Sequence, residues 1–165
     1  MMKKEEFSSI FSFMGAGASE IAPYIGVTKR WVNYARAHDD WGRVEYRVAF
    51  RELEEVMLGA VREARECFRG DVAFQSAVSG DASGVVVMVE YPFSAEEQDE
   101  SVLPLGCWQQ LAAYVRAGLR LAYPDIRVEM VPPGASAEDV VEVGEGRAVT
   151  SVFSFRFNGL TPELG

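Results

Sequence analysis

The strongest structural signal in the chain is the stretch 46–70, YRVAFRELEEVMLGAVREARECFRG. Apolar residues recur in it at steps of three and four, with arginine and glutamate between them, which is the period of an amphipathic helix. The apolar positions are Tyr46, Phe50, Leu53, Met57, Ala60, Val61, Ala64, Cys67 and Phe68. Gly70 ends the pattern, as a glycine just past a helix commonly does. The pattern does not determine the first residue of this helix, because residues 44–48 also alternate like a strand.

Two strand candidates follow this helix. Residues 72–78 form a short one, and residues 85–92, VVVMVEYP, form a second that is rich in β-branched residues. Small and polar residues at 79–84 separate them, so we expect a hairpin. The unbroken apolar run at the start of the second candidate indicates burial on both faces of a sheet, or an interface on the second face.

A second amphipathic helix begins near residues 101–105 and ends before Tyr123 and Pro124. Its apolar stripe consists of Trp108, Leu111, Ala112, Val115, Leu119 and Ala122. Gly118 costs about 1 kcal/mol relative to alanine inside a helix, so we expect it to pack closely against another element. Further strands are expected at residues 126–131 and 147–157, with a linker-like break at 132–138 between them.

This element order predicts an α+β fold with an antiparallel or mixed four-stranded sheet and two amphipathic helices on one face. The other face, or an edge, is then left for ligands, partners or further copies of the chain. We expect residues 1–44 to form a helical N-terminal arm and residues 45–165 to form the body. Residues 8–17 look linker-like in composition.

The net charge of −9 is unevenly distributed. Residues 1–44 contain six basic and five acidic side chains, which leaves ten basic and twenty acidic ones for residues 45–165. An acidic surface repels phosphate backbones and favours solubility or basic partners. A role in nucleic-acid binding must therefore come from the N-terminal part.

Few residues in the chain are suited to catalysis. His38 is the one histidine, and Asp39 and Asp40 follow it in a predicted loop with no partner spacing for a metal site or a catalytic triad. Cys67 and Cys107 lie far apart on the apolar sides of predicted helices and are expected to be buried thiols. We expect no enzymatic activity, no cofactor and no metal site.

Residues 20–32, EIAPYIGVTKRWV, resemble the helix-turn-helix of bacterial DNA-binding proteins. Ala22, Ile25, Gly26, Thr28 and Val32 match its small, apolar, turn, cap and anchor positions, in that order. The resemblance implies DNA binding by residues 19–37, a transcriptional regulator with an acidic oligomerisation or effector body, and a second helix whose exposed face meets the groove. The DNA-binding residues would be Thr28, Lys29, Arg30, Asn33 and Arg36.

The leading expectation is a different one, namely a non-enzymatic assembly module. The predicted element order resembles that of small subunits at phage neck and tail junctions, such as tail terminators, which implies a homo-oligomer that also contacts other assembly proteins. Aromatic residues often anchor interfaces, and the candidates are Phe13, Trp31, Tyr34 and Trp41. The sequence predicts no membrane span and no secretory signal, so we expect a cytoplasmic or virion location.

Overall fold

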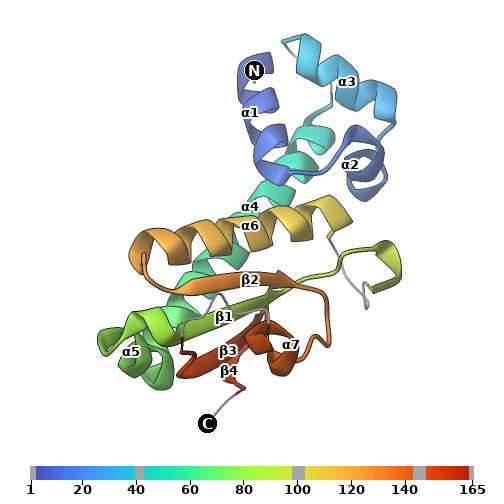
Figure 1. Ribbon diagram of the computed structural model, residues 1–165. Helices are drawn as coiled ribbons and strands as arrows, with labels where there is room; N and C mark the ends of the chain where they lie inside the picture. Colours follow the sequence, from blue (N-terminus) through green and yellow to red (C-terminus); the bar gives the residue numbers. More distant parts are fainter. Residues whose placement is uncertain (1–2, 40–42, 98–102, 143–147, 164–165) are drawn as a thin grey trace. The chain divides into compact units, whose positions relative to one another are not determined.

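The computed structural model describes residues 3–39, 43–97, 103–142 and 148–163 (Figure 1). Its helices are α1 (Lys4–Met14), α2 (Ala18–Ile25), α3 (Lys29–Ala37), α4 (Val44–Gly70), α5 (Val72–Ser79), α6 (Leu105–Ala122) and α7 (Ala137–Glu142). The strands are β1 (Val85–Glu90), β2 (Arg127–Val131), β3 (Ser151–Arg156) and β4 (Gly159–Pro162). The protein is therefore α+β with a helical N-terminal arm, as the sequence predicts.

The chain forms two compact units. Unit 1 comprises residues 1–59 and 94–111, and unit 2 comprises residues 60–93 and 112–165. The helices α4 and α6 each contribute one part to either unit. The chain thus divides differently from the expected boundary between residues 44 and 45.

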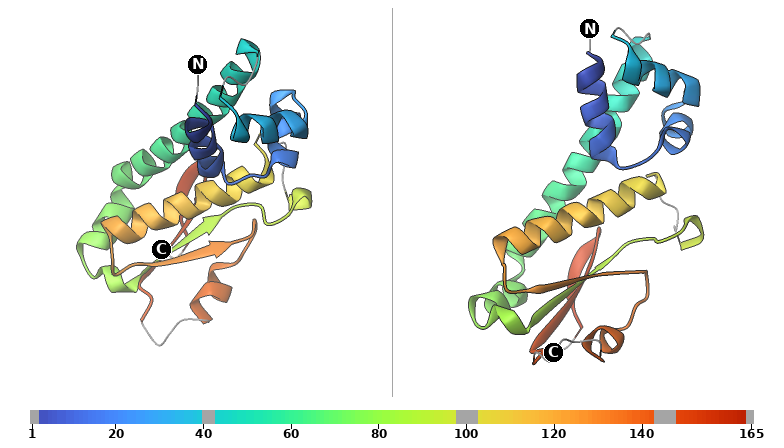
Figure 2. Two further views of the ribbon diagram at one scale, coloured as in Figure 1. Left: turned by 90° about the horizontal axis from the view of Figure 1, so that it is seen from above. Right: turned by 45° about the horizontal axis from the view of Figure 1, so that its top comes forward.

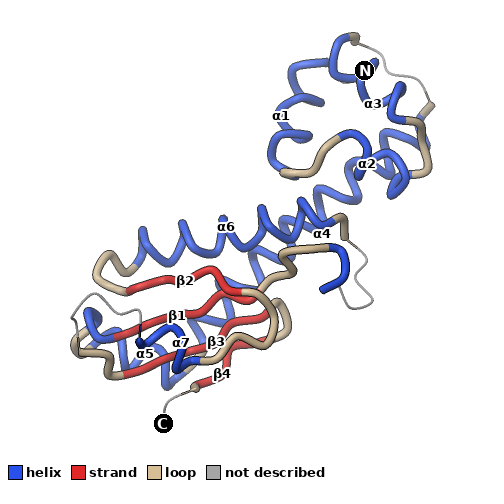
Figure 3. The backbone as a smooth tube through the Cα atoms, turned by 45° about the vertical axis from the view of Figure 1, so that its right-hand side comes forward, coloured by secondary structure: helices blue, strands red, loops and turns tan. Residues whose placement is uncertain are grey.

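The sheet belongs to unit 2 and has the strand order β2-β1-β3-β4 (Figure 3). The central strand β1 is parallel to both neighbours, with Val87 opposite Val128 of β2 and Phe153 of β3. The last strand, β4, runs antiparallel to β3. The sheet is therefore mixed, which is one of the two arrangements that the sequence left open.

Helices cover both faces of this sheet. Val85, Val87 and Val89 of β1 share one core with the second parts of α4 and α6 and with α5. The two residues between them, Val86 and Met88, belong to a second, smaller core on the other face, which α7 helps to form (Figure 2). Burial on both faces explains the apolar run, and the two long helices do share one face. However, α7 covers part of the face that was expected to stay available.

Residues 72–78 form the helix α5, so the prediction of a strand there, and of a hairpin with residues 85–92, is wrong. Asp71 caps this helix by accepting a hydrogen bond from the N–H of Phe74 at 2.8 Å. Gln75 then donates from Nε2 to the carbonyl of Phe68, also at 2.8 Å, and ties α5 to the end of α4. A short apolar run suits a strand or a buried helix equally well, and here the cap and this tie favour the helix.

The strand β4 was not expected, because glycine and proline are weak strand formers. It forms through a two-residue turn after β3, which places Gly159 opposite Arg156. Pro162 is tolerated because β4 is an edge strand, where one side of the backbone makes no ladder. The predicted strand at 147–157 is confirmed over the residues of β3.

Unit 1 is built on aromatic and aliphatic side chains from α1 to α4. The ring of Phe7 in α1 stacks on Phe50 in α4, with centroids 4.2 Å apart, and both residues are fully buried. Since α1 occupies most of residues 8–17, the interpretation of that segment as a linker is wrong. The segment also approaches α6 closely, because a Cβ added to Gly106 would lie 2.8 Å from the carbonyl oxygen of Gly15.

Candidate functional site

The connection between α2 and α3 is a tight turn with a defined cap. Gly26 ends α2 in the left-handed conformation, at φ 77°, and its N–H donates to the carbonyls of Ala22 and Pro23. Glycine adopts this conformation without the steric cost that a Cβ brings. Thr28 begins α3 by accepting a hydrogen bond from the N–H of Trp31 on its side-chain oxygen at 3.1 Å. The resemblance to a helix-turn-helix assigns the turn and the cap to these same positions.

The helix α1 packs against α3 as a third helix, which was not expected from the residues before Ser19. Its Phe7 contacts Trp31 of α3 edge-on, with ring centroids 6.0 Å apart. Val32 and Ala35 of α3 are fully buried. One face of α3 is therefore fixed against the rest of unit 1, and Figure 2 shows α1, α2 and α3 grouped together.

The remaining face of α3 is polar and basic. Its exposed residues include Thr28, Lys29, Arg30, Asn33 and Arg36. The guanidinium of Arg36 lies 4.7 Å from the ring centroid of Phe11, so its side chain rests on α1. Lys29 and Arg30 occupy the first turn, where the helix dipole disfavours positive charge. Their position does not stabilise α3. It places two cations in the first turn of α3, directly after the glycine turn.

Two acidic side chains of unit 1, Asp39 and Glu20, have partners of their own. Asp39 accepts a hydrogen bond from the N–H of Lys4 at 3.0 Å and pairs with Lys3 at 3.4 Å. These two contacts, the first more than the second, hold the pKa of Asp39 below its ordinary value. Glu20 of α2 accepts a hydrogen bond from the N–H of Gly106 in α6. Neither carboxylate is paired with the basic side chains of α3.

The aromatic interface candidates occupy different environments. Trp31 is half-buried and packs edge-on against two aromatic rings, and Phe13 is half-buried as well. Tyr34 is exposed and stacks on His38, with ring centroids 4.1 Å apart. Trp41 lies outside the described residues. Tyr34 is thus the candidate that the described structure places most openly on the surface of unit 1.

The residues considered for catalysis do not gather into a site. His38 is exposed, and its Nδ1 lies 3.1 Å from the carbonyl oxygen of Tyr34 in the preceding turn. Its neighbour Asp40 lies outside the described residues. Across the described ranges, no three histidine, cysteine, aspartate or glutamate side chains are grouped so that they could hold a metal ion. Both Cys67 and Cys107 are free.

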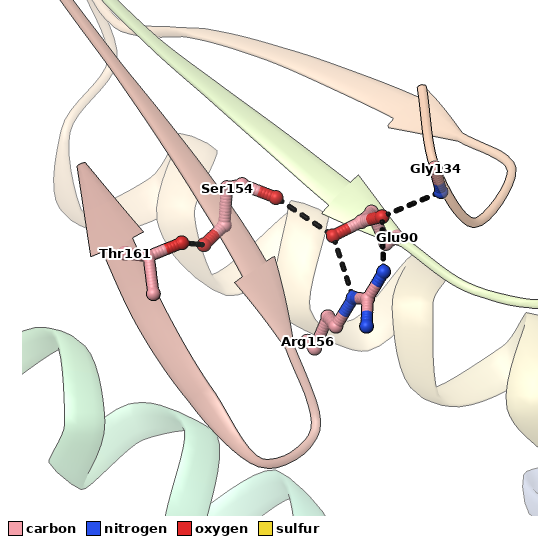
Figure 4. Close-up of polar contacts among 5 residues, drawn as sticks. All are labelled: Glu90, Gly134, Ser154, Arg156 and Thr161. Atoms are coloured by element: carbon pink, nitrogen blue, oxygen red, sulfur yellow. Dashed lines mark hydrogen bonds and ion pairs between the residues drawn. The ribbon is translucent and has the colours of Figure 1, made fainter. Parts of the chain in front are cut away.

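A polar cluster that the sequence did not indicate lies at the carboxyl ends of β1 and β3 (Figure 4). Glu90 accepts hydrogen bonds from Ser154 at 2.7 Å, from Arg156 at 2.9 and 3.2 Å, and from the N–H of Gly134 at 3.0 Å. Burial alone would raise the pKa of Glu90, but these donors together lower it below its ordinary value. The carboxylate is therefore held ionised and joins three segments of unit 2.

This cluster lies beyond the carboxyl ends of parallel strands, which is the edge where ligands often bind in open sheets. Both oxygens of Glu90 are nevertheless occupied by protein donors, which suits a structural role better than that of a proton acceptor. One sequence signal was available, since Glu90 is the charged residue that ends the apolar run of β1. Its partners come from distant segments, and spacing alone does not reveal them.

No model of a known protein family matches the chain, and no curated protein matches it in sequence. Among the described helices, none combines the length and apolar character needed to cross a membrane.

Proposed function

We propose that the chain binds duplex DNA through α2 and α3, with α3 lying in the major groove. The observation that carries this proposal is the division of α3 into a buried face and an exposed basic face, directly after a glycine turn and a threonine cap. Lys29, Arg30 and Arg36 would contact phosphates or guanine edges, and Asn33 is suited to an adenine edge.

The charge of the rest of the chain makes this proposal easy to test. Residues 45–165 contain twice as many acidic as basic side chains and repel a phosphate backbone. Affinity for DNA would therefore depend strongly on the few cations of α3. A chain that bound DNA through a diffuse basic surface would not have this dependence.

The test starts with selection of preferred duplexes from a random library by the full chain, followed by fluorescence anisotropy over a range of salt concentrations. The variant Lys29→Ala/Arg30→Ala/Arg36→Ala should lose most of its affinity. Its plot of log affinity against log salt should become shallower by about three, because each lost phosphate contact removes about 0.9 from the slope. Asn33→Ala should instead reduce discrimination between sequences.

The matched control is Arg62→Ala/Arg116→Ala/Arg120→Ala, which removes the same charge from exposed positions on α4 and α6. This control should retain nearly all of the affinity. Equal losses in the two triple variants would mean that net charge alone governs binding. That result, or the absence of any selected duplex, would refute the proposal.

Self-association is a second candidate function, and a row of valines on α4 favours it. Val44, Val48 and Val56 are 58%, 48% and 45% exposed and lie on one row of four-residue steps along the helix, in which the exposed Glu52 stands between Val48 and Val56. Residues at steps of four form the ridge that packs into the groove of another helix. We propose that a second copy of the chain covers this valine ridge through its own α4.

The valine ridge, and not the order of helices and strands, supports self-association of this chain. The resemblance to tail-terminator subunits depended on a helix followed by two strands, whereas α4 is followed by the helix α5. The edge strands of the sheet are also poorly suited to pairing with a strand of another copy, because β4 ends in Pro162 and β2 carries the ion pair of Arg127 with Glu129. Association through strands, as first expected, is therefore less favoured than association through a helix.

A further inference from the structure

An open cavity of about 440 Å³ lies between the second parts of α4 and α6, within unit 2. Its apolar lining includes Val61, Ala64, Phe68, Val115 and Leu119. Cavities that bind small molecules have volumes of roughly 300–1,000 Å³ and are lined mainly by apolar side chains. The size and lining of this cavity thus suit a small ligand with an apolar body.

The wall of the cavity is held in place by other side chains. Tyr123, at the end of α6, accepts a hydrogen bond from Nε2 of Gln75 at 3.1 Å. Its ring also meets Phe74 edge-on, with centroids 5.4 Å apart. Because α5 supplies both partners, contacts within unit 2 fix the position of Tyr123 in the wall of the cavity.

Gly118 is the first observation that favours ligand binding in this cavity. A Cβ at this position would meet no atom within 4 Å, so the expectation of close packing here is wrong. A glycine inside a helix is less stable than alanine by about 1 kcal/mol, and among the described residues no neighbouring atom lies close enough to exclude an alanine Cβ at this position. What the glycine does provide is space, since Gly118 itself lines the cavity.

Two arginines supply the second such observation. Arg65 and Arg69 line the cavity one helical turn apart on α4, and both are exposed. Like charges at this spacing destabilise a helix. Within the described part of the chain, neither guanidinium is in an ion pair with a carboxylate. An anion bound between them would remove the repulsion and gain charge-assisted hydrogen bonds.

We propose that this cavity binds a small organic anion with an apolar tail, of the class of medium-chain monocarboxylates. The tail lies along the apolar lining beside Gly118, and the carboxylate meets Arg65 and Arg69. The proposal concerns unit 2 and does not depend on whether α3 binds DNA. Failure of either proposal therefore leaves the other unaffected.

The experiment is calorimetric titration of the full chain with decanoate and, separately, with decan-1-ol, below the concentrations at which they aggregate. Decanoate should bind with one site per chain. In Gly118→Leu the new side chain fills the cavity, so binding should be lost while α6 gains helix propensity. Ala117→Leu is the matched control, since Ala117 is exposed on the same helix and does not line the cavity; it should bind as the original chain does.

A second pair of variants tests the charge. Arg65→Gln/Arg69→Gln should weaken decanoate binding by about tenfold or more, because hydrogen bonds to a charged group are lost, and should leave decan-1-ol binding unchanged. Arg62→Gln/Arg116→Gln removes the same charge elsewhere and should change neither. Failure of decanoate to saturate, or equal binding by Gly118→Leu and the original chain, would overturn the proposal. A chain whose mass in solution falls to the monomer value in Gly118→Leu would overturn it too, because a second copy would then occupy the cavity.

Discussion

At the scale of single residues, Glu90 illustrates what a buried charge requires. Its side chain is 8% exposed, yet its oxygens accept hydrogen bonds from Ser154, Arg156 and the N–H of Gly134. The side chain of Arg156 is 56% exposed, so water screens its attraction to the carboxylate. The bonds from Ser154 and Gly134 therefore matter at least as much as the ion pair.

We predict that Glu90→Gln lowers the free energy of unfolding by about 1–3 kcal/mol, because an amide cannot accept from all of these donors. The pKa of Glu90 is lowered in the folded chain, so its contribution is present above the ordinary value of 4.5 and is lost as the pH falls through the folded value. Urea unfolding at a series of acidic pH values measures both effects.

The control for this prediction is Glu66→Gln, a change at an exposed position of α4. It should leave both the stability and its pH dependence nearly unchanged. The structural role of Glu90, whose carboxylate joins three segments of unit 2, would be refuted if the two variants lost stability equally. It would also be refuted if Glu90→Gln kept the acid sensitivity of the original chain.

At the scale of elements, two glycines show how position decides the effect of one substitution. Gly118 lies inside α6 with open space at its Cβ position, whereas Gly26 ends α2 at φ 77°. We predict that Gly118→Ala raises the free energy of unfolding by about 0.5–1 kcal/mol through helix propensity. Gly26→Ala should lower it by about 1–2 kcal/mol, because an L side chain is strained in that conformation.

Urea midpoints of the two alanine variants check these signs. Gly26→Ala should also weaken binding of a selected duplex, since the turn fixes how α3 leaves α2. Two shifts of the same sign would contradict either the open space at Gly118 or the left-handed conformation of Gly26.

At the scale of the whole molecule, the valine ridge on α4 makes a prediction about mass in solution. Light scattering during size-exclusion chromatography should give a mass well above 18.2 kDa. Val48→Ser/Val56→Ser should return it to the monomer value, because the ridge loses its apolar contact area. Val72→Ser is the control, since Val72 is 82% exposed on α5 and lies outside the ridge. A monomer at high concentration would rule out self-association.

Much of the candidate DNA-binding site was predictable from residues 20–36. Gly26, Thr28 and Val32 act locally, through backbone conformation, capping and helical period, so their spacing was informative. The support from α1 was not predictable, because residues 8–17 contain glycine, serine and alanine near the end of that helix and look like a linker. Phe7 gains its role only by packing against Trp31 and Phe50, which are distant in the sequence.

The sequence by itself determined the two long helices and three of the four strands, since period and β-branched composition act within a few residues of the chain. Tertiary structure decided the rest: the helical state of residues 72–79, the parallel pairing of β1, and the edge strand β4. Tertiary structure also decided the hydrogen-bonded cluster around Glu90 and the cavity beside Gly118. The physical reason is that these features depend on contacts between distant segments, whose free energy exceeds local preferences of a few tenths of a kcal/mol per residue.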